Sequence, residues 1–158
     1  MILISFKVQE DLTNNLVDLL GHYKSINDGL VEKDCCTMRG FQTKNIFGYP
    51  ENYYLKPVIE NMLPKKLNLF HMHLIDYDPY GYQLKHNHAT TEDYSFILYL
   101  NDVERGETVF EKDQTKIKCE KNKMIVFKSD LWHYGKECLT RKKVAVGAMH
   151  DEKKVHKR

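Results

Sequence analysis

The sequence predicts a mainly β protein with N-terminal helices, an α+β chain whose core is a β-sandwich or β-barrel. Two observations support this fold class. Near the N-terminus, hydrophobic residues recur at helical spacing. From residue 67 onward, short runs rich in β-branched and aromatic residues alternate with turn-forming residues. Several short strands at regular spacing are typical of all-β sandwiches and barrels, so we expect the helices to pack in front of one.

The N-terminal part is expected to hold a strand, two helices and a long loop. Residues 2–8 read as a strand, and residues 10–24 predict an amphipathic helix because four leucines and a tyrosine fall on one face. Residues 25–50 are polar, and we expect there a loop with one short strand, a candidate lid. A second helix is expected over residues 51–63, with Pro57 as a kink.

Six short runs in the C-terminal part predict the strands of the β core. Turn residues fill the segments between them, among them "DPYG" after the first run and "NDVERG" after the second. The six runs are residues 67–77, 94–100, 107–111, 115–120, 123–129 and 142–150.

Length and composition indicate one folded domain. The chain has 158 residues, of which 42% are hydrophobic and 29% charged, enough to bury a core. We expect a single domain over residues 1–158, with helical support and loop over 1–65, the β core over 66–150 and a basic tail over 151–158. No apolar run approaches the ~20 residues of a membrane helix, and no signal peptide is recognisable, so we expect a cytoplasmic protein without a membrane partner. The net charge of +2 is too small to favour nucleic acid as a partner.

Two histidines separated by one residue, His86 and His88, are candidate metal ligands. On a strand, side chains two positions apart point to the same face about 7 Å apart, so both rings can face one ion. His133, 45 residues after His88, offers a third ligand. Histidines suit iron(II), zinc, copper or nickel, and three facial ligands with open positions are typical of non-haem iron oxygenases. His71 and His73 have the same spacing, but we expect His73 to be a pocket-lining or core histidine that forms hydrogen bonds rather than a metal ligand.

The order of motifs around these histidines resembles the 2-oxoglutarate and iron(II)-dependent dioxygenases, especially their prolyl 4-hydroxylase-like branch. A tyrosine precedes "HNH", and then follow "YLND", "GETVF", "KMIVF" and a lone histidine with basic residues after it. The resemblance covers about half of the chain, from residue 67 to about residue 150. It implies a double-stranded β-helix, the jelly-roll core that cupins share.

The resemblance also implies roles for individual residues. His86 matches the first metal ligand of the family and His133 the last. Tyr77 matches the tyrosine that contacts the cosubstrate, and Tyr99 and Thr108 match residues that line the same pocket.

A basic residue is expected to pair with the far carboxylate of 2-oxoglutarate. Lys143 lies ten residues after His133, the interval found in the prolyl 4-hydroxylase-like branch. Arg141 offers a guanidinium, which can bind a carboxylate in a bidentate manner. Both residues share one face of the expected strand, and the sequence leaves the choice open.

His88 stands where the family has a metal-binding aspartate. Three alternatives stay open: His88 binds the metal in a three-histidine site, Glu92 or Asp93 supplies the carboxylate, or the site is weak or inactive. The H-x-H form resembles some phage-type sequences that read "YQ-x-x-H-x-H", so a viral or phage origin is one interpretation.

The resemblance implies an oxygenase that uses iron(II), 2-oxoglutarate and dioxygen, with ascorbate as an optional reductant. Such an enzyme would hydroxylate a substrate C–H bond while 2-oxoglutarate is decarboxylated to succinate. The branch points to a prolyl residue or free proline, and hence to a peptidyl or small-molecule substrate. The alternative function is a cupin-type β-barrel that binds metal or ligand through three histidines and uses no 2-oxoglutarate.

Overall fold

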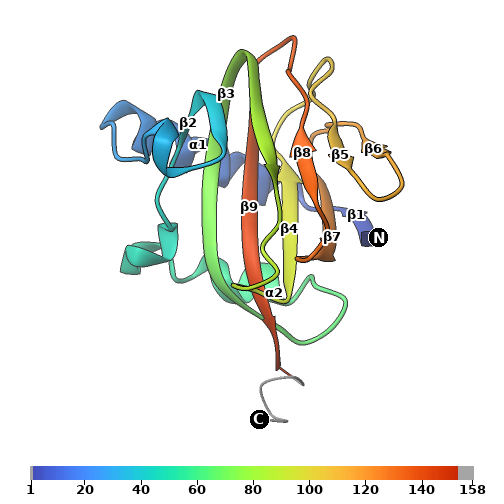
Figure 1. Ribbon diagram of the computed structural model, residues 1–158. Helices are drawn as coiled ribbons and strands as arrows, with labels where there is room; N and C mark the ends of the chain where they lie inside the picture. The colour runs from blue at the N-terminus through green and yellow to red at the C-terminus, as the bar shows by residue number, and fades with distance from the viewer. Residues whose placement is uncertain (1, 153–158) are drawn as a thin grey trace.

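The computed structural model describes residues 2–152 and shows a curled antiparallel sheet of nine strands (Figure 1). Hydrogen-bonded neighbours follow the order β1-β7-β4-β9-β3-β8-β5-β6, and β2 pairs with β3 beside this path. The predicted mainly β fold with N-terminal helices is confirmed. The strands are β1 (Ile2–Lys7), β2 (Thr37–Gln42), β3 (Leu67–His86), β4 (Tyr94–Tyr99), β5 (Thr108–Phe110), β6 (Thr115–Ile117), β7 (Lys123–Lys128), β8 (His133–Gly135) and β9 (Lys142–Asp151).

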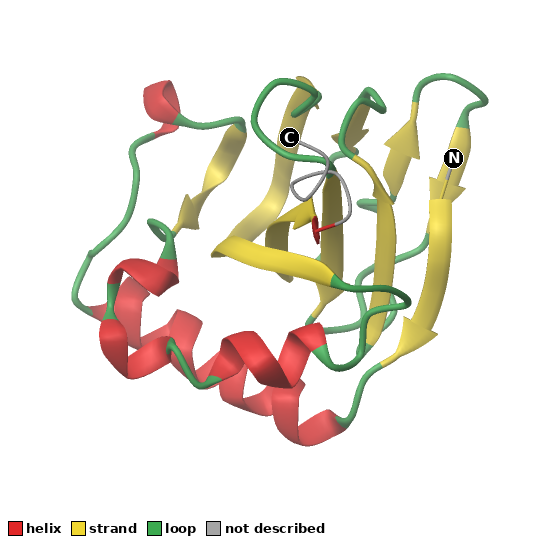
Figure 2. Ribbon diagram, turned by 90° about the horizontal axis from the view of Figure 1, so that it is seen from below, coloured by secondary structure: helices red, strands yellow, loops and turns green. Residues whose placement is uncertain are grey.

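The two α-helices lie on one side of the sheet, as Figure 2 shows. The predicted amphipathic helix is α1 (Glu10–Ser25). The second helix, α2 (Leu55–Glu60), is shorter than predicted and follows three 3₁₀ turns, η1 (Glu32–Asp34), η2 (Ile46–Gly48) and η3 (Pro50–Asn52). Pro57 lies in the first turn of α2 and causes no kink, because the first backbone N–H groups of a helix have no partner within it.

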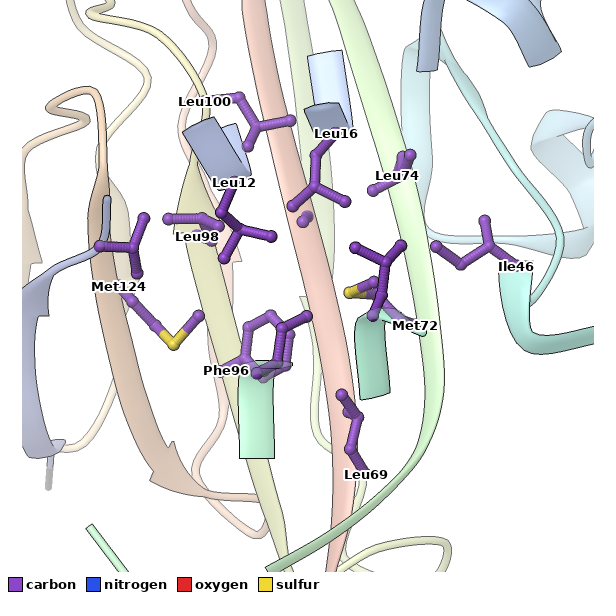
Figure 3. Close-up of a cluster of buried hydrophobic side chains, with 14 of the residues drawn as sticks. Leu12, Leu16, Ile46, Leu69, Met72, Leu74, Phe96, Leu98, Leu100 and Met124 are labelled. Carbon is purple, nitrogen blue, oxygen red and sulfur yellow. The ribbon is translucent and has the colours of Figure 1, made fainter. Parts of the chain in front are cut away.

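One hydrophobic core fills the space between the helices and the outer face of the sheet. Leu12 and Leu16 of α1 reach down to Met72 of β3 and Phe96 of β4 (Figure 3), and at most 8% of any of these side chains is exposed. Fully burying one such side chain stabilises the fold by roughly 1.5–3 kcal/mol. Because successive side chains of a strand point to opposite faces, the residues between these core positions face the other way, into the curl of the sheet.

A second, smaller core lies inside the curl. It contains Ile75 and Tyr77 of β3, Tyr99 of β4 and Phe127 of β7, all at most 2% exposed. Because β3, β4, β7 and β9 each contribute alternate residues to the two cores, the phase of each strand decides which side chains reach the interior of the barrel.

The predicted loop at residues 25–50 contains β2, which is hydrogen-bonded to β3. Gly40 pairs with Tyr77, and a Cβ atom at position 40 would come within 2.8 Å of the carbonyl oxygen of Asp76. This segment therefore adds a strand to the sheet instead of forming a free lid.

The turn predicted at "DPYG" is instead a bend within the long strand β3. Between Tyr77 and Tyr82, β3 advances five residues while its partner β2 advances two, from Gly40 to Met38. Tyr80 absorbs the bend with a φ of 70°. Continued pairing with β2 on both sides of the bend keeps the segment in the sheet, so β3 first lies beside β9 and then beside β8.

The C-terminal strand β9 runs to Asp151. The remainder of the predicted basic tail, residues 153–158, lies outside the described residues. Within residues 2–152, no helix combines the length and the apolar character needed to span a membrane.

Candidate metal and cosubstrate site

Strand pairing brings two of the predicted metal ligands together. His86, the last residue of β3, is paired with His133, the first residue of β8, and their ring centroids are 4.4 Å apart. The ring of His88, just after β3, lies 4.8 Å from that of His86 and 6.4 Å from that of His133. Three imidazoles therefore meet at one end of the curled sheet.

The hydrogen bonds of His86 and His133 leave one nitrogen of each ring available to a metal. Nδ1 of His86 lies 2.8 Å from the carbonyl oxygen of Leu84, and Nδ1 of His133 lies 3.0 Å from that of Leu131. A carbonyl only accepts, so each Nδ1 carries the proton and Nε2 keeps its lone pair. Burial lowers the pKa of both rings, that of His133 to about 3, and neutral imidazole is the form that binds metals.

His88 differs from the other two because its partner is a carboxylate. Nδ1 of His88 lies 3.6 Å from Oε1 of Glu92. Burial raises the pKa of Glu92 to about 7, and the hydroxyls of Ser95 and Thr91 donate to its two oxygens at 2.6 and 3.3 Å. A carboxylate behind a histidine commonly orients a metal-binding ring.

The structure also shows where the other candidate carboxylate lies. Oδ2 of Asp93 accepts a hydrogen bond from the backbone N–H of Asp151 and lies 3.7 Å from Nδ1 of His150. These partners belong to the end of β9, so the carboxylate of Asp93 is engaged away from His86.

The donor set suits a metal, but the ring of His88 has to turn to complete it. Within residues 2–152, no three histidine, cysteine, aspartate or glutamate side chains form a ready metal-binding group. Two imidazoles that share a metal have centroids roughly 4.5–5.5 Å apart, given metal–nitrogen distances near 2.1 Å. The pair His86 and His133 is already at about that distance, whereas His88 and His133 are 6.4 Å apart.

The three predicted cosubstrate-pocket residues lie on inner faces of the sheet. The hydroxyls of Tyr99 and Thr108 are 2.6 Å apart, and both residues are buried. Tyr77 is buried in the same inner cluster as Tyr99. Burial raises the pKa of both tyrosines, so their hydroxyls remain protonated at neutral pH.

A buried lysine that the sequence analysis did not select lies next to these residues. Lys142, the first residue of β9, pairs with Tyr77 and is only 5% exposed. Its Nζ donates to the carbonyl of Gly106 at 2.7 Å and lies 5.3 Å from the centroid of the Tyr77 ring. A Cβ at Gly135 would stand 3.4 Å from this Nζ, so the glycine keeps the space beside the ammonium group open. Lys142 forms no ion pair with the residues that the structure describes.

The side chains of both predicted basic anchors, Arg141 and Lys143, do not face the barrel interior as Lys142 does. Arg141 is exposed and bound to Asp76 at 2.6 Å and to Asp78 at 3.0 Å. Lys143 shares the phase of Ala145 in the outer core, one position away from the inward-facing Lys142. Lys142 shares the phase of Val144, which belongs to the inner core, but alternation along the sequence does not tell which of the two faces is the interior.

The second histidine pair lies close to this site. His71 and His73 are joined by a hydrogen bond of 3.0 Å between Nε2 and Nδ1. Both line a cavity that His88 also borders. The prediction that His73 lines a pocket and forms a hydrogen bond is confirmed.

Similarity to known proteins is found in the fold alone. No family model matches the sequence, and no curated protein matches it. Among solved structures, a prolyl-4-hydroxylase from Pseudomonas putida superimposes with a TM-score of 0.68 at 15% identity, over 93% of this chain and 91% of that one. The viral collagen prolyl hydroxylase of Paramecium bursaria Chlorella virus-1, in its 2-oxoglutarate complex, gives 0.63 at 16% identity, over 92% and 94% of the two chains.

A third similar structure is HygX from Streptomyces hygroscopicus with nickel, 2-oxoglutarate and hygromycin B bound. It gives a TM-score of 0.69 at 8% identity and covers 93% of this chain and 82% of that one. The curled sheet with its covering helices is therefore the double-stranded β-helix that these three proteins share.

Proposed function

We propose that this protein is an iron(II) and 2-oxoglutarate-dependent oxygenase that hydroxylates a substrate C–H bond and releases succinate. One observation carries the proposal. Inside a double-stranded β-helix, His86 and His133 face each other with free Nε2 atoms. The buried Lys142, which has no counter-ion within residues 2–152, lies on the neighbouring inner face. Such a pairing suits a metal and a carboxylate-bearing cosubstrate bound side by side.

His86, His88 and His133 would hold the metal. When bound there, iron(II) supplies the activation of dioxygen that no amino-acid side chain provides. Three neutral imidazoles leave the metal centre one unit more positive than a set with one carboxylate, which strengthens attraction for a dianionic cosubstrate. Glu92 would fix the ring of His88 from behind, as a carboxylate partner does for many metal-binding histidines.

Lys142 would anchor the far carboxylate of 2-oxoglutarate, in place of Arg141 or Lys143. A buried ammonium group is costly unless it is paired, and among the described residues Nζ of Lys142 donates to the carbonyl of Gly106, which is uncharged. An incoming carboxylate would supply the missing charge. By contrast, the exposed Arg141 is already paired with two aspartates, Asp76 and Asp78.

The remaining pocket residues would orient the cosubstrate and exclude water. The hydroxyls of Tyr99 and Thr108 share one hydrogen bond, so one of their two O–H groups is left to donate to a carboxylate without adding charge. Tyr77 packs its ring under Nζ of Lys142 and limits where the ammonium group can move. A dry, preorganised site strengthens each of these contacts.

The substrate we propose is a prolyl residue of a peptide or protein, or free proline. Two similar folds belong to prolyl hydroxylases, whereas HygX was crystallised with hygromycin B. Because one fold hosts many substrates, the substrate has to be established by turnover.

The test is anaerobic addition of iron(II) and 2-oxoglutarate to the metal-free protein. We expect a weak visible charge-transfer band, and succinate formation once air is admitted. His133→Ala should abolish both signals, whereas His22→Ala, an exposed histidine on α1, should change neither. A protein that binds iron but gives neither band nor succinate would contradict the proposal and favour the cupin-type metal-binding barrel.

A second experiment addresses the role of His88. His88→Asp restores the carboxylate that related oxygenases carry at the matching position. If His88 is a ligand, this variant still binds one iron per chain and its rate of succinate formation changes. Iron binding and succinate formation that are unaffected by both His88→Asp and His88→Ala would exclude His88 from the site.

A further inference from the structure

A cavity of about 250 Å³ lies beside the histidines, four to six residues along β9 from Lys142. Phe70, His71 and His73 of β3 and the neighbouring Val146 and Ala148 of β9 form its floor, because His71 pairs with Ala148 and His73 with Val146. The volume is smaller than the ~300–1,000 Å³ of sites for drug-sized ligands, so it can hold one group of side-chain size.

The cavity borders the proposed metal site. His88 and Glu92 both line it. A group inside the cavity therefore lies next to one of the proposed metal ligands, on the side of the site that is away from the basic anchor. This is where a substrate C–H bond would have to be held.

The polar groups that line the cavity include two hydrogen-bonded, uncharged imidazoles, those of His71 and His73. Burial lowers the pKa of His71 and brings that of His73 to about 3, so both rings are neutral at physiological pH. Each neutral imidazole has one N–H and one lone pair. Since one of each is used in the bond between the two rings, the pair has one donor and one acceptor left at its outer ends. Exchange of both tautomers swaps these ends without creating charge.

A carboxylate finds no counter-ion among the described residues that line the cavity. Within residues 2–152, no lysine or arginine lines it, so an entering carboxylate would lose its hydration without compensation. Glu92 is the one acid in the wall, and its oxygens already accept hydrogen bonds from Ser95 and Thr91.

We propose that this cavity is the substrate subsite, and that it takes a compact uncharged group bearing one hydroxyl or amide that hydrogen-bonds to the His71–His73 pair. The assignment as a substrate subsite rests on the proposed function. The cavity would then favour a residue within a peptide chain, whose ends are neutral amides, over a free zwitterionic amino acid.

The test is a binding titration by ligand-observed NMR with three probes of one shape: cyclopentanol, cyclopentanecarboxylate and cyclopentylammonium. The metal-free protein is first loaded with zinc(II) and 2-oxoglutarate. Because zinc(II) has no redox chemistry, no turnover occurs. We expect cyclopentanol to bind and both charged probes to bind at least tenfold more weakly. His73→Phe keeps a flat ring but removes the hydrogen bond, and should weaken cyclopentanol binding about tenfold.

Two further variants separate this subsite from general effects on the protein. Ala148→Leu fills the cavity and should abolish binding of cyclopentanol, whereas His22→Phe on the exposed face of α1 should leave it unchanged. Equal binding of the three probes, or cyclopentanol binding that neither His73→Phe nor Ala148→Leu weakens, overturns the proposal. Because the titration needs no turnover, a protein that forms no succinate but binds cyclopentanol here would refute the oxygenase function and leave the neutral-ligand cavity standing.

Discussion

Replacing Lys142 by methionine should remove most of the affinity for 2-oxoglutarate. Methionine keeps the volume of the buried stem and deletes the ammonium group, which is 2.7 Å from the carbonyl of Gly106. A charge-assisted hydrogen bond to a carboxylate contributes about 1.5–3 kcal/mol, which corresponds to roughly 10- to 100-fold in the dissociation constant. The measurement is an anaerobic titration of the iron(II) protein with 2-oxoglutarate, followed by its charge-transfer band.

The neighbouring basic residues provide matched controls. Arg141→Met, just before β9, and Lys143→Met, within it, remove one positive charge each from side chains that point away from the barrel interior. We expect less than a twofold change in 2-oxoglutarate affinity for either variant, and thermal unfolding of all three variants verifies that they are folded. If Lys143→Met or Arg141→Met weakens binding as much as Lys142→Met does, the reasoning from strand phase is refuted.

Three more predictions concern steric access, pH and packing. Gly135→Ala should weaken 2-oxoglutarate binding by more than tenfold at unchanged iron content, because its Cβ would stand 3.4 Å from Nζ of Lys142; unchanged affinity would mean that the cosubstrate does not approach this glycine. The metal-free protein should lose stability as pH falls from about 6.5 toward 4, since the folded pKa values of His73 and His133 are lowered to about 3 and the unfolded chain binds the extra protons. Each of the two should contribute about 1.4 kcal/mol per pH unit in that window, measured by urea unfolding, and a stability that is flat with pH would contradict the assignment. Leu16→Ala, at a fully buried position of α1, should cost about 3 kcal/mol in the same assay, and a cost below 1 kcal/mol would argue against the packing of α1 on the sheet.

Elements with a strong local pattern were predictable from the sequence. The helix α1 follows from the spacing of residues such as Leu12 and Leu16, and β4, β7 and β9 follow from runs of β-branched and aromatic residues. Elements that depend on partners distant in the sequence were not predictable from it. The short strand β8 exists because it pairs with β3 and β5, and the bend at Tyr80 stays in the sheet because β2 pairs on both sides of it.

The sequence by itself determined the residue types of the candidate site and the order in which they occur. His86, His88 and His133 are recognisable because histidines at that spacing, among those motifs, are typical of one metal chemistry. Tertiary structure alone decided how they meet: pairing of β3 with β8 sets His86 opposite His133, and the partner of His88 is Glu92.

The basic anchor shows the physical reason most clearly. Residues 141–143 are three consecutive cations, and alternation along a strand tells only that the middle one faces away from the other two. Which face is the interior depends on where the helices cover the sheet, because a shift of one residue exchanges the two faces completely. The helices cover the face of Ala145, so Lys142 points inward beside Tyr77 and Gly135, and that placement is a property of the folded sheet rather than of any local sequence signal.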